Sequence, residues 1–372
     1  MKTARLIVAD SEHDANLLYA TGLFVPDPFI YFEVAGKKYA VLSDLELDRA
    51  RRQARVDRVL SLTHYVRRLK NEGVKTPRLA DVLRRVLAHF RVRRVEVPQN
   101  FPVGLAKRLR GIPVDVAADP FYPARAVKTP AEVRHLERAL WLAEEGMRAA
   151  VNVLRMSRIG RGGYLYWRGD KLTSEHVQGV IGATIAGLGG TASRTIVAGG
   201  NQGCDPHEVG HGPLRAHQTI ILDIFPRDNT TGYWGDITRT VVRGRASAAV
   251  KKLYALVGQG QQLAFDRLRA GVDGQDIHNA IQAHFRAHGC PTRRHRGRME
   301  GFFHGTGHGV GLEIHEMPRV GAISEKLQSG QVVTVEPGLY YHGKGGVRLE
   351  DMVVIGQRGN RNLTQFPKQL EI

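Results

Sequence analysis

The amino-acid sequence predicts an α/β domain over residues 1–124, followed by a larger α+β domain over residues 125–372. Short apolar runs alternate with helix-like segments in the first 120 or so residues, a rhythm typical of α/β domains. A proline-containing segment follows, and a long amphipathic helix begins directly after it. The 372 residues are enough for two domains of ordinary size.

The elements of the first domain follow from short β-branched runs and from helical spacing of apolar residues. Its predicted strands are Leu6 to Ala9, Pro28 to Val34, Tyr39 to Ser43 and Arg93 to Val97, and its predicted helices lie within Asp14 to Leu23, Arg67 to Lys70 and Leu79 to Phe90.

The second domain begins with a clear helix start after the linker-like segment 119–128. Thr129 is a good N-cap, Pro130 suits the first turn, and Glu132 stands at the third position after the cap. Apolar residues then recur every three or four positions, as in a long amphipathic helix. Further helices are expected at about 246–270 and 274–288, between strand-rich stretches at 219–242 and 331–356.

Composition indicates a globular protein, with 42% hydrophobic and 24% charged residues. The sequence contains neither an apolar run of membrane-spanning length nor a secretory signal, so we expect a cytoplasmic protein without a membrane partner. Cys204 and Cys290 are far apart and in no repeated spacing, so reduced thiols are expected.

The net charge of +18 is spread over both predicted domains, which favours a solvated basic surface. Weak adhesion to nucleic acid or attraction of anionic peptides are the alternatives. Zinc-finger spacing and RNP-type strands are absent from the sequence, so no specific nucleic-acid partner is predicted. The densest cluster, Arg293, Arg294, Arg296 and Arg298, is interpreted as a solubilising loop near the cleft entrance; alternatively, one arginine binds the C-terminal carboxylate of a short substrate.

Two aspartates lie in strand-like sequence that forms a predicted hairpin. Asp223 and Asp236 are 13 residues apart, with turn residues at 228–232 between them. A turn centred between Asn229 and Thr230 would place them directly opposite each other, with Cβ atoms about 5 Å apart. Two buried carboxylates that close repel unless a cation lies between them. The alternative is that one aspartate faces solvent and the other pairs with Arg239.

A second predicted hairpin carries two glutamates in the same kind of context. Glu336 ends one β-branched strand, Glu350 lies near the start of another, and the segment 341–346 supplies the turn. Carboxylates together with a histidine suit Mn²⁺, Co²⁺, Fe²⁺ or Zn²⁺. Bridging carboxylates favour two ions, about 3.5–4 Å apart, that share a hydroxide.

Histidines are concentrated in the segment 302–316, where His304, His308 and His315 stand among four glycines. Glycine permits the close backbone approach that a crowded site requires. His207 lies in the turn-rich segment 199–208, where it can equally be an ordinary polar residue.

The order Asp, Asp, His, Glu, Glu resembles the metal ligands of the pita-bread-fold metallopeptidases. The flanking motifs GYWGDITRT, HGTGHGVGLEIHE, VEPGLYY and GVRLED are similar to those of the Xaa-Pro aminopeptidase and Xaa-Pro dipeptidase (prolidase) branch. The resemblance covers essentially all of 126–372 and, more weakly, the segment 14–22. It implies a creatinase-like N-terminal α/β domain before a pita-bread catalytic domain.

The resemblance also implies residue roles. The implied metal ligands are Asp223 on one ion, His308 and Glu336 on the other, and Asp236 and Glu350 as bridges. The implied catalytic residues are Glu336 as proton shuttle, and His207 and His315 as hydrogen-bond donors to the scissile carbonyl. The implied substrate-binding residues are His304, Tyr340 and Arg348. Cys204 is not expected to be a ligand. One departure is that Phe225 stands where the family has glycine, in an interval about two residues longer, so the pocket rim near Pro226 is expected to differ.

The implied function is hydrolysis of the peptide bond between an N-terminal residue and proline by a hydroxide that bridges two divalent ions, with Mn²⁺ favoured over Co²⁺ or Zn²⁺. A proline-containing peptide is the implied substrate, and a homodimer the implied assembly. A methionine aminopeptidase is disfavoured by the separate N-terminal domain, and a metal-free creatinase-like hydrolase by the complete ligand set. A catalytically inactive pita-bread domain that acts as a binding module is the alternative from another class. The sequence does not choose between dipeptidase and aminopeptidase.

Overall fold

The computed structural model describes residues 2–372, and the chain divides between Arg125 and Ala126 into two compact units. The first unit is built on one six-stranded sheet with the order β4-β3-β2-β1-β5-β6. Strands β1, β2 and β3 are antiparallel, whereas β5 runs parallel to β1. The strands are β1 Lys2–Ala9, β2 Phe29–Val34, β3 Lys37–Leu42, β4 Arg58–Ser61, β5 Val92–Val97 and β6 Val114–Val116.

Both faces of this sheet are covered, because successive residues of a strand point to opposite sides. Leu6 of β1 packs in one apolar cluster with residues of α3 and α4, while Ile7 packs in another with residues of α1 and α2. The predicted strands and helices of this region are confirmed; α2, α5, β4 and β6 were not predicted. The helices are α1 Ala15–Thr21, α2 Leu47–Gln53, α3 Leu62–Asn71, α4 Leu79–His89 and α5 Val103–Ala106.

The second unit opens with the long helix α6, Pro130–Met156, and its start confirms the predicted capping box. The Thr129 hydroxyl accepts the Glu132 N–H at 3.3 Å, and the Glu132 carboxylate accepts the Thr129 N–H at 2.8 Å. Leu136 and Leu140, one turn apart, are both buried. The sequence signals of cap and periodicity therefore place this helix correctly.

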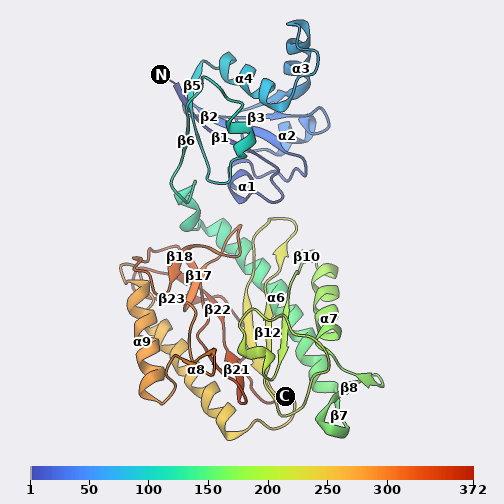
Figure 1. Ribbon diagram of the computed structural model, residues 1–372, viewed down its shortest axis with the longest axis vertical. Helices are drawn as coiled ribbons and strands as arrows, with labels where there is room; N and C mark the ends of the chain where they lie inside the picture. The colour runs from blue at the N-terminus through green and yellow to red at the C-terminus, as the bar shows by residue number, and fades with distance from the viewer. Residues whose placement is uncertain (1) are drawn as a thin grey trace. The chain divides into compact units, whose positions relative to one another are not determined.

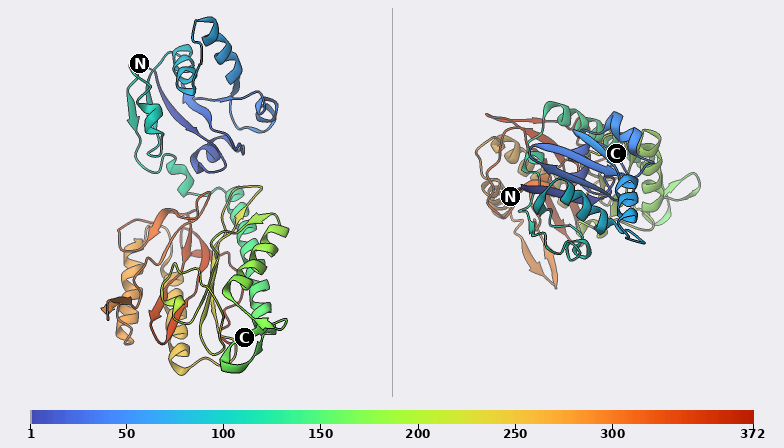
Figure 2. Two further views of the ribbon diagram at one scale, coloured as in Figure 1. Left: turned by 45° about the vertical axis from the view of Figure 1, so that its right-hand side comes forward. Right: turned by 90° about the horizontal axis from the view of Figure 1, so that it is seen from above.

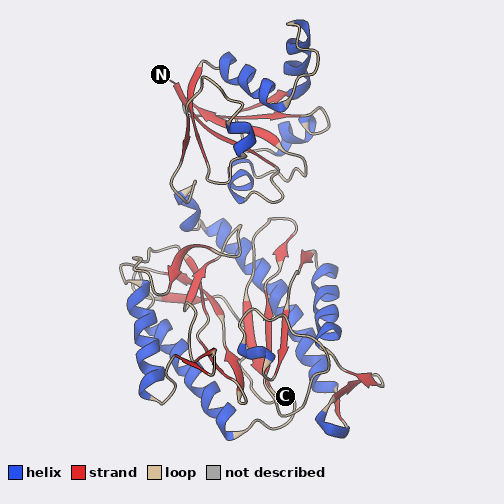
Figure 3. Ribbon diagram, in the orientation of Figure 1, coloured by secondary structure: helices blue, strands red, loops and turns tan. Residues whose placement is uncertain are grey.

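The α-helices of the second unit flank its strands, as Figures 1 and 3 show. Helices α6 and α7 lie together on one side, and α8 and α9 lie together on the other. Within residues 2–372, no helix combines the length and apolarity needed to cross a membrane. The helices after α6 are α7 Ser174–Gly187, α8 Ala248–Arg267 and α9 Gly274–Ala287.

Two sheets of this unit position the acidic residues. One has the order β11-β12-β14 and contains Asp223, and the other has the order β18-β17-β19-β22-β23 and contains His308. The strands of the first sheet are β11 Ile196–Gly199, β12 Ile220–Ile224 and β14 Ile237–Val241. Those of the second are β17 Gly307–Gly309, β18 Glu316–Val320, β19 Val332–Val335, β22 Asp351–Ile355 and β23 Asn360–Asn362.

The predicted glutamate hairpin is confirmed. Strand β19 pairs with β22, and β20 (Gly338–Tyr341) pairs with β21 (Gly345–Arg348), in one continuous register. Val335 is opposite Asp351 and Gly338 is opposite Arg348. Glu336 and Glu350 therefore occupy opposing positions in the short gap between the two ladders.

The aspartate hairpin forms, but its predicted register is wrong. Asp223 is opposite Thr238, not Asp236, because the turn is centred between Thr230 and Thr231, one residue later than expected. The Asp228 carboxylate accepts the N–H groups of both threonines, at 2.7 and 3.2 Å, which fixes the turn there. The shift in pairing is two residues, so Asp223 and Asp236 become diagonal neighbours on the same face of the sheet.

The basic run is also not the loop that was expected. Arg293–His295 (β15) and Arg298–Glu300 (β16) form a two-stranded hairpin that projects beyond α9, drawn in orange in Figure 2. Its turn residues Arg296 and Gly297 both have positive φ, at 47° and 79°, as a tight two-residue hairpin turn requires. All four arginines are exposed.

The close approach of β21 to the segment after β11 yields a stability prediction. A Cβ atom at Gly346 would lie 1.8 Å from the Gly203 carbonyl oxygen, so the backbone must move to accept alanine. We expect Gly346→Ala to lower the free energy of unfolding by about 3 kcal/mol in urea titrations. Gly359→Ala is the control, because a Cβ there meets open space, and it should leave stability within about 0.5 kcal/mol. Equal stabilities would contradict the predicted clash.

Candidate active site

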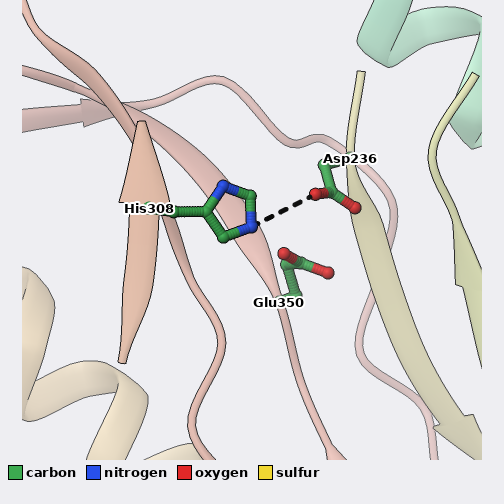
Figure 4. Close-up of side chains that lie close together, drawn as sticks. All are labelled: Asp236, His308 and Glu350. Atoms are coloured by element: carbon green, nitrogen blue, oxygen red, sulfur yellow. Dashed lines mark ion pairs between the residues drawn. The ribbon is translucent and has the colours of Figure 1, made fainter. Parts of the chain in front are cut away.

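Acidic and histidine side chains on or next to strands β12, β14, β17, β19 and β22 of the second unit meet at one place. Asp236, just before β14, His308 of β17 and Glu350, just before β22, point toward one another in Figure 4. Each offers a ligand atom, and these three atoms all lie within 4.8 Å of one another. All three residues are buried. The structure thus brings together three of the five predicted ligands in a group that can hold a metal ion.

Glu336 and Asp223 border this group. His308 Nε2 lies 3.4 Å from Glu336 Oε1 and 3.7 Å from Asp236 Oδ2. Asp223 is on the neighbouring strand β12, and its negative charge raises the pKa values of Asp236 and Glu350. All five predicted ligands are therefore clustered in one region.

The conformation of His308 leaves its inner nitrogen available as a ligand. Its Nδ1 lies 3.2 Å from the Gly309 carbonyl oxygen, so Nδ1 carries the hydrogen and Nε2 keeps its lone pair toward the carboxylates. Burial, followed by the neighbouring His315, lowers the pKa of His308 to about 3, so the ring is neutral. Glycine precedes His308 because a Cβ at Gly307 would lie 1.9 Å from the Thr334 carbonyl oxygen.

Burial and the charges of neighbouring carboxylates raise the pKa values of three carboxyl groups in the cluster. Burial raises the pKa of Asp236 well above its usual range, and the charges of Glu350 and Asp223 raise it further. The pKa of Glu350 is raised in the same way, by burial and then by Glu336 and Asp223. Burial raises the pKa of Glu336 to about 7, against the opposing field of Arg348. Each shift means that a deprotonated carboxylate is unfavourable here unless a cation is added.

Two carboxylate oxygens are also without hydrogen bonds. Asp223 Oδ1 and Asp236 Oδ1 are buried and find no partner among residues 2–372. Buried polar atoms are rarely left unpaired without a functional reason. The donor set of this region, carboxylate oxygens and one imidazole nitrogen, fits divalent transition-metal ions.

The buried Arg348 forms an ion pair with Asp223, one of the predicted ligands. Its Nη2 donates to Asp223 Oδ2 at 2.6 Å, its Nη1 donates to the Tyr340 hydroxyl at 3.1 Å, and its Nε donates to Thr238 Oγ1 at 3.2 Å. The side chain is 3% exposed. In this structure Arg348 therefore organises site residues, and its expected contact with substrate stays a prediction.

Tyr340 connects Arg348 to His304. Because its hydroxyl oxygen accepts from Arg348, the hydroxyl donates to His304 Nε2, at 2.8 Å. The other nitrogen, Nδ1, lies 2.8 Å from the Gly305 carbonyl oxygen and 4.0 Å from Glu336 Oε2. Burial lowers the pKa of His304 to about 3 and raises that of Tyr340 to about 12, so both side chains are neutral.

The two histidines expected to act on substrate lie at the border of the cluster. The His315 ring stands edge-on to His308, with centroids 4.4 Å apart, and its pKa is lowered mainly by burial. His207 is exposed, and it contributes to the lowered pKa values of His304 and His315. Both therefore lie near the predicted ligands.

Several residues that hold the site were not predicted. Thr238 Oγ1 donates to Glu350 Oε2 at 2.7 Å, and Thr334 Oγ1 accepts the His308 N–H at 3.0 Å. The signal was present, because each threonine is two residues from a predicted acid and hence shares its strand face. Arg319 was also missed, and its charge acts on His308, His315 and Glu336.

The alternative partner for the aspartates is wrong. Arg239 pairs with Asp351, with Nη2 and Oδ1 2.8 Å apart, rather than with Asp223 or Asp236. Cys204 packs in an apolar cluster with Ile196 and Tyr340, and burial raises the pKa of its thiol to about 11. Its thiol thus remains protonated, in keeping with the expectation that it is not a ligand.

Solved structures of other proteins share the fold of this chain. The X-Pro aminopeptidase from Thermotoga maritima MSB8 is similar with a TM-score of 0.82 and 23% identity, covering 100% of this chain and 97% of that one. The prolidase from Pyrococcus horikoshii OT3 has a TM-score of 0.80 and 22% identity, covering 99% and 95%. At this level of identity the likeness shows the fold. The predicted α/β N-terminal domain followed by a pita-bread domain is confirmed.

Sequence comparison identifies the family. An uncharacterized peptidase of Bacillus subtilis (strain 168), YqhT, is 32% identical over 254 residues, which are 67% of this chain and 65% of that protein. The Xaa-Pro dipeptidase of Pyrococcus furiosus is 28% identical over 248 residues, which are 66% and 65%. The matched stretch thus spans slightly less than two thirds of either relative. The model of metallopeptidase family M24 matches residues 134–357, and the chain belongs to this family.

Proposed function

We propose that the chain is a metal-dependent exopeptidase that hydrolyses the bond between an N-terminal residue and proline. The observation that carries this proposal is the buried cluster of uncompensated carboxylates around His308. The family match lies within the unit 126–372, so this unit is the proposed catalytic domain, and the first unit is its proposed creatinase-like partner domain.

The residues present fit two divalent ions. Asp236 and Glu350 would bridge the ions, and Asp223, His308 and Glu336 would complete their coordination, with Mn²⁺ as the favoured metal and Co²⁺ or Zn²⁺ as alternatives. When bound, such a pair lowers the pKa of a shared water so that hydroxide is available near neutral pH. The unpaired oxygens of Asp223 and Asp236 support this assignment, because both are buried lone pairs without a donor.

The remaining groups would act on the peptide. Glu336, whose Oε1 lies 3.4 Å from His308 Nε2 at the border of the cluster, would carry a proton to the leaving proline nitrogen. His207 and His315, which lie near the cluster, would hydrogen-bond the scissile carbonyl as its oxygen gains charge. His304 and Tyr340 would line the substrate position, with their neutral rings fixed by their mutual hydrogen bond.

Charge near the site bears on substrate length. Two of the exposed arginines of the β15–β16 hairpin have partners outside the cluster, since Arg293 Nη2 lies 3.6 Å from the buried Glu300 carboxylate and Arg298 lies beside His342. Arg319, in contrast, acts electrostatically on three residues of the cluster. We therefore propose Arg319, rather than the hairpin, as the residue that binds the free carboxylate of a dipeptide, which favours dipeptidase over aminopeptidase activity.

The second candidate, an inactive binding module, receives less support, because all five ligand types and the flanking histidines occupy one region. A homodimer and a cytoplasmic location complete the proposal. The two buried cysteines, both free, are compatible with a reducing compartment, and sedimentation of the purified protein tests the dimer.

The function is tested by hydrolysis of Ala-Pro, Ala-Ala and Ala-Pro-amide with Mn²⁺, Co²⁺ or Zn²⁺. We expect metal-dependent cleavage of Ala-Pro that exceeds cleavage of Ala-Ala at least tenfold in kcat/KM. Arg319→Met should raise KM for Ala-Pro about tenfold and leave the amide unchanged, because the amide lacks the carboxylate. Arg294→Met, on the exposed hairpin, is the matched control and should change neither. Absence of Xaa-Pro cleavage with every metal would refute the proposed activity.

The histidines yield a separate prediction. His315→Ala and His207→Ala should each retain both ions but lower kcat by about 100-fold, the effect of losing one donor to the oxyanion. His308→Ala should instead lower metal content, measured by elemental analysis of the dialysed protein. An unchanged kcat in His207→Ala would reduce that residue to an ordinary surface histidine.

The raised pKa values predict an unusual effect on stability. A carboxyl whose pKa is raised by folding stabilises the protein below its unfolded pKa, and this contribution is lost as pH rises through the folded pKa. Metal-free Asp236→Asn should therefore be more stable than metal-free wild type at pH 7.5, by about 1–2 kcal/mol, and the difference should shrink toward pH 4. Urea unfolding in a chelator measures both.

Asp228→Asn is the control for this prediction. Asp228 is equally buried, but its carboxylate already accepts two backbone N–H groups in its turn. Its replacement should not stabilise the metal-free protein. If Asp236→Asn is destabilising at pH 7.5, the carboxylates do not repel one another as inferred.

A further inference from the structure

The guanidinium of Arg239, in the middle of β14, is 2% exposed, and all of its hydrogen-bond donors are used. An arginine has five N–H donors in a fixed planar fork. Here Nε donates to the Pro367 carbonyl at 3.1 Å, Nη1 to the Thr238 and Glu350 carbonyls at 2.9 and 2.6 Å, and Nη2 to Asp351 Oδ1 and the Phe366 carbonyl at 2.8 and 2.6 Å. Full use of all five donors fixes the position of every acceptor.

Two of these acceptors are the backbone carbonyls of Glu350, a proposed metal ligand, and of Thr238, whose hydroxyl donates to the Glu350 carboxylate. Thr238 and Glu350 contact each other through Thr238 Oγ1 and Glu350 Oε2 at 2.7 Å, and the Glu350 N–H donates to the Thr238 carbonyl at 3.1 Å. Arg239 binds the backbone carbonyls of the same two residues. Arg239 therefore holds together strand β14 and the segment that contains Glu350.

Two further acceptors belong to the C-terminal tail, residues 363–372. The tail follows β23 of the sheet β18-β17-β19-β22-β23. Its end lies beside the residue that follows β14, where the Ile372 N–H donates to the Val242 carbonyl at 3.0 Å. Between these ends, Glu144 of α6 accepts the Gln365 and Phe366 N–H groups. The tail thus runs from β23 to the end of β14, and Arg239 binds it between these two points.

We propose that Arg239 is a positioning residue for the metal centre and that the C-terminal tail, through Arg239, is part of that centre. The inference rests on the proposed function, because it requires that the cluster binds metal. The acids of the two sheets repel one another, so their spacing must be imposed by the surrounding structure. A guanidinium that binds the backbone of β14, of the Glu350 segment and of the tail supplies that constraint at the position where Glu350 is presented.

The role of Arg239 is geometric rather than a matter of charge. Asp351, the one acidic partner of Arg239 within residues 2–372, is also held through Oδ2 by Lys368 at 2.6 Å and by Asn362 at 2.9 Å. Removing Arg239 would therefore leave Asp351 with a cation but would release four backbone carbonyls. Lysine, with three donors on a flexible stem, cannot reach four carbonyls and a carboxylate at once.

The test measures Mn²⁺ retained by the full-length protein during dialysis against increasing chelator, and the rise in Tm when Mn²⁺ is added to each metal-free variant. Arg239→Met, Arg239→Lys and a chain ending at Gln365 should each lose metal at a chelator concentration at least tenfold lower than wild type, the scale for residues that orient metal ligands. Because each Tm rise is referred to the same variant without metal, general destabilisation cancels.

Arg243→Met is the matched control. Arg243 donates to the Ile372 carbonyl at 3.3 Å and to Ser157 at 3.0 and 3.2 Å, so it holds the end of the tail without contacting the Glu350 segment. This variant should retain metal within about twofold of wild type.

The outcomes separate the two proposals. Wild type that retains no Mn²⁺, Co²⁺ or Zn²⁺ would refute the proposed function. Wild type that retains metal, with equal retention in Arg239→Met or in the shortened chain, would overturn the role of Arg239 and the tail. Wild-type retention in Arg239→Lys would show that charge alone suffices and would overturn the geometric role. If Arg239→Met does not fold, the shortened chain decides, because it removes only exposed or half-buried side chains.

Discussion

The structure of the second unit depends on burying several carboxylates close together. Asp236 and Glu350 are each less than 5% exposed, and the pKa of each is raised by burial and by the charges of its neighbours. In a medium of low dielectric constant such repulsion is strong, and an unpaired buried charge costs several kcal/mol. A cation bound at this position would remove the repulsion, and the free energy released would strengthen its binding.

The surrounding residues hold the acids in place without neutralising most of them. Thr238 and Thr334 supply hydroxyls to Glu350 and Glu336, and such neutral donors orient a carboxylate while leaving its charge. Within residues 2–372, Asp223 alone among the four predicted acidic ligands pairs directly with an arginine or lysine, namely Arg348, whose other donors contact Tyr340 and Thr238. Because neutral hydroxyls orient Glu350 and Glu336, and Arg348 pairs directly with Asp223, the cluster keeps enough negative charge to attract a metal ion.

Much of the fold and of the site could be predicted because local signals and global structure agree. The cap at Thr129 and the acids in two hairpins were read correctly. The register of the aspartate hairpin was not, because it depends on which residues the Asp228 carboxylate binds in the turn, and composition alone does not fix this. The one-residue error in the turn changed the cross-strand partner of Asp223. It left Asp223 and Asp236 on the same face of the sheet, so both still lie in the predicted cluster.

Other features were beyond sequence reasoning for a different reason. Arg239 was considered only as a partner for the nearby aspartates, because a pattern within one segment gives no access to contacts made 110 or more residues later. Its real partners lie in the Glu350 segment and in the tail. The basic run from Arg293 was expected to be a loop because arginines carry little strand signal, whereas the positive φ values of Arg296 and Gly297 create a hairpin there.

The surplus of positive charge acts on a different scale from the site. Exposed charges are screened beyond about 8 Å at physiological ionic strength. The net charge of +18 therefore cannot offset repulsion between buried carboxylates, and the cations that shift the pKa of Glu336 are the neighbouring Arg348 and Arg319. The diffuse surplus can still raise the rate at which anionic peptides meet the surface at low salt. Encounter at the surface thus depends on exposed charges that salt screens, whereas the repulsion within the cluster acts between buried carboxylates, which salt reaches much less.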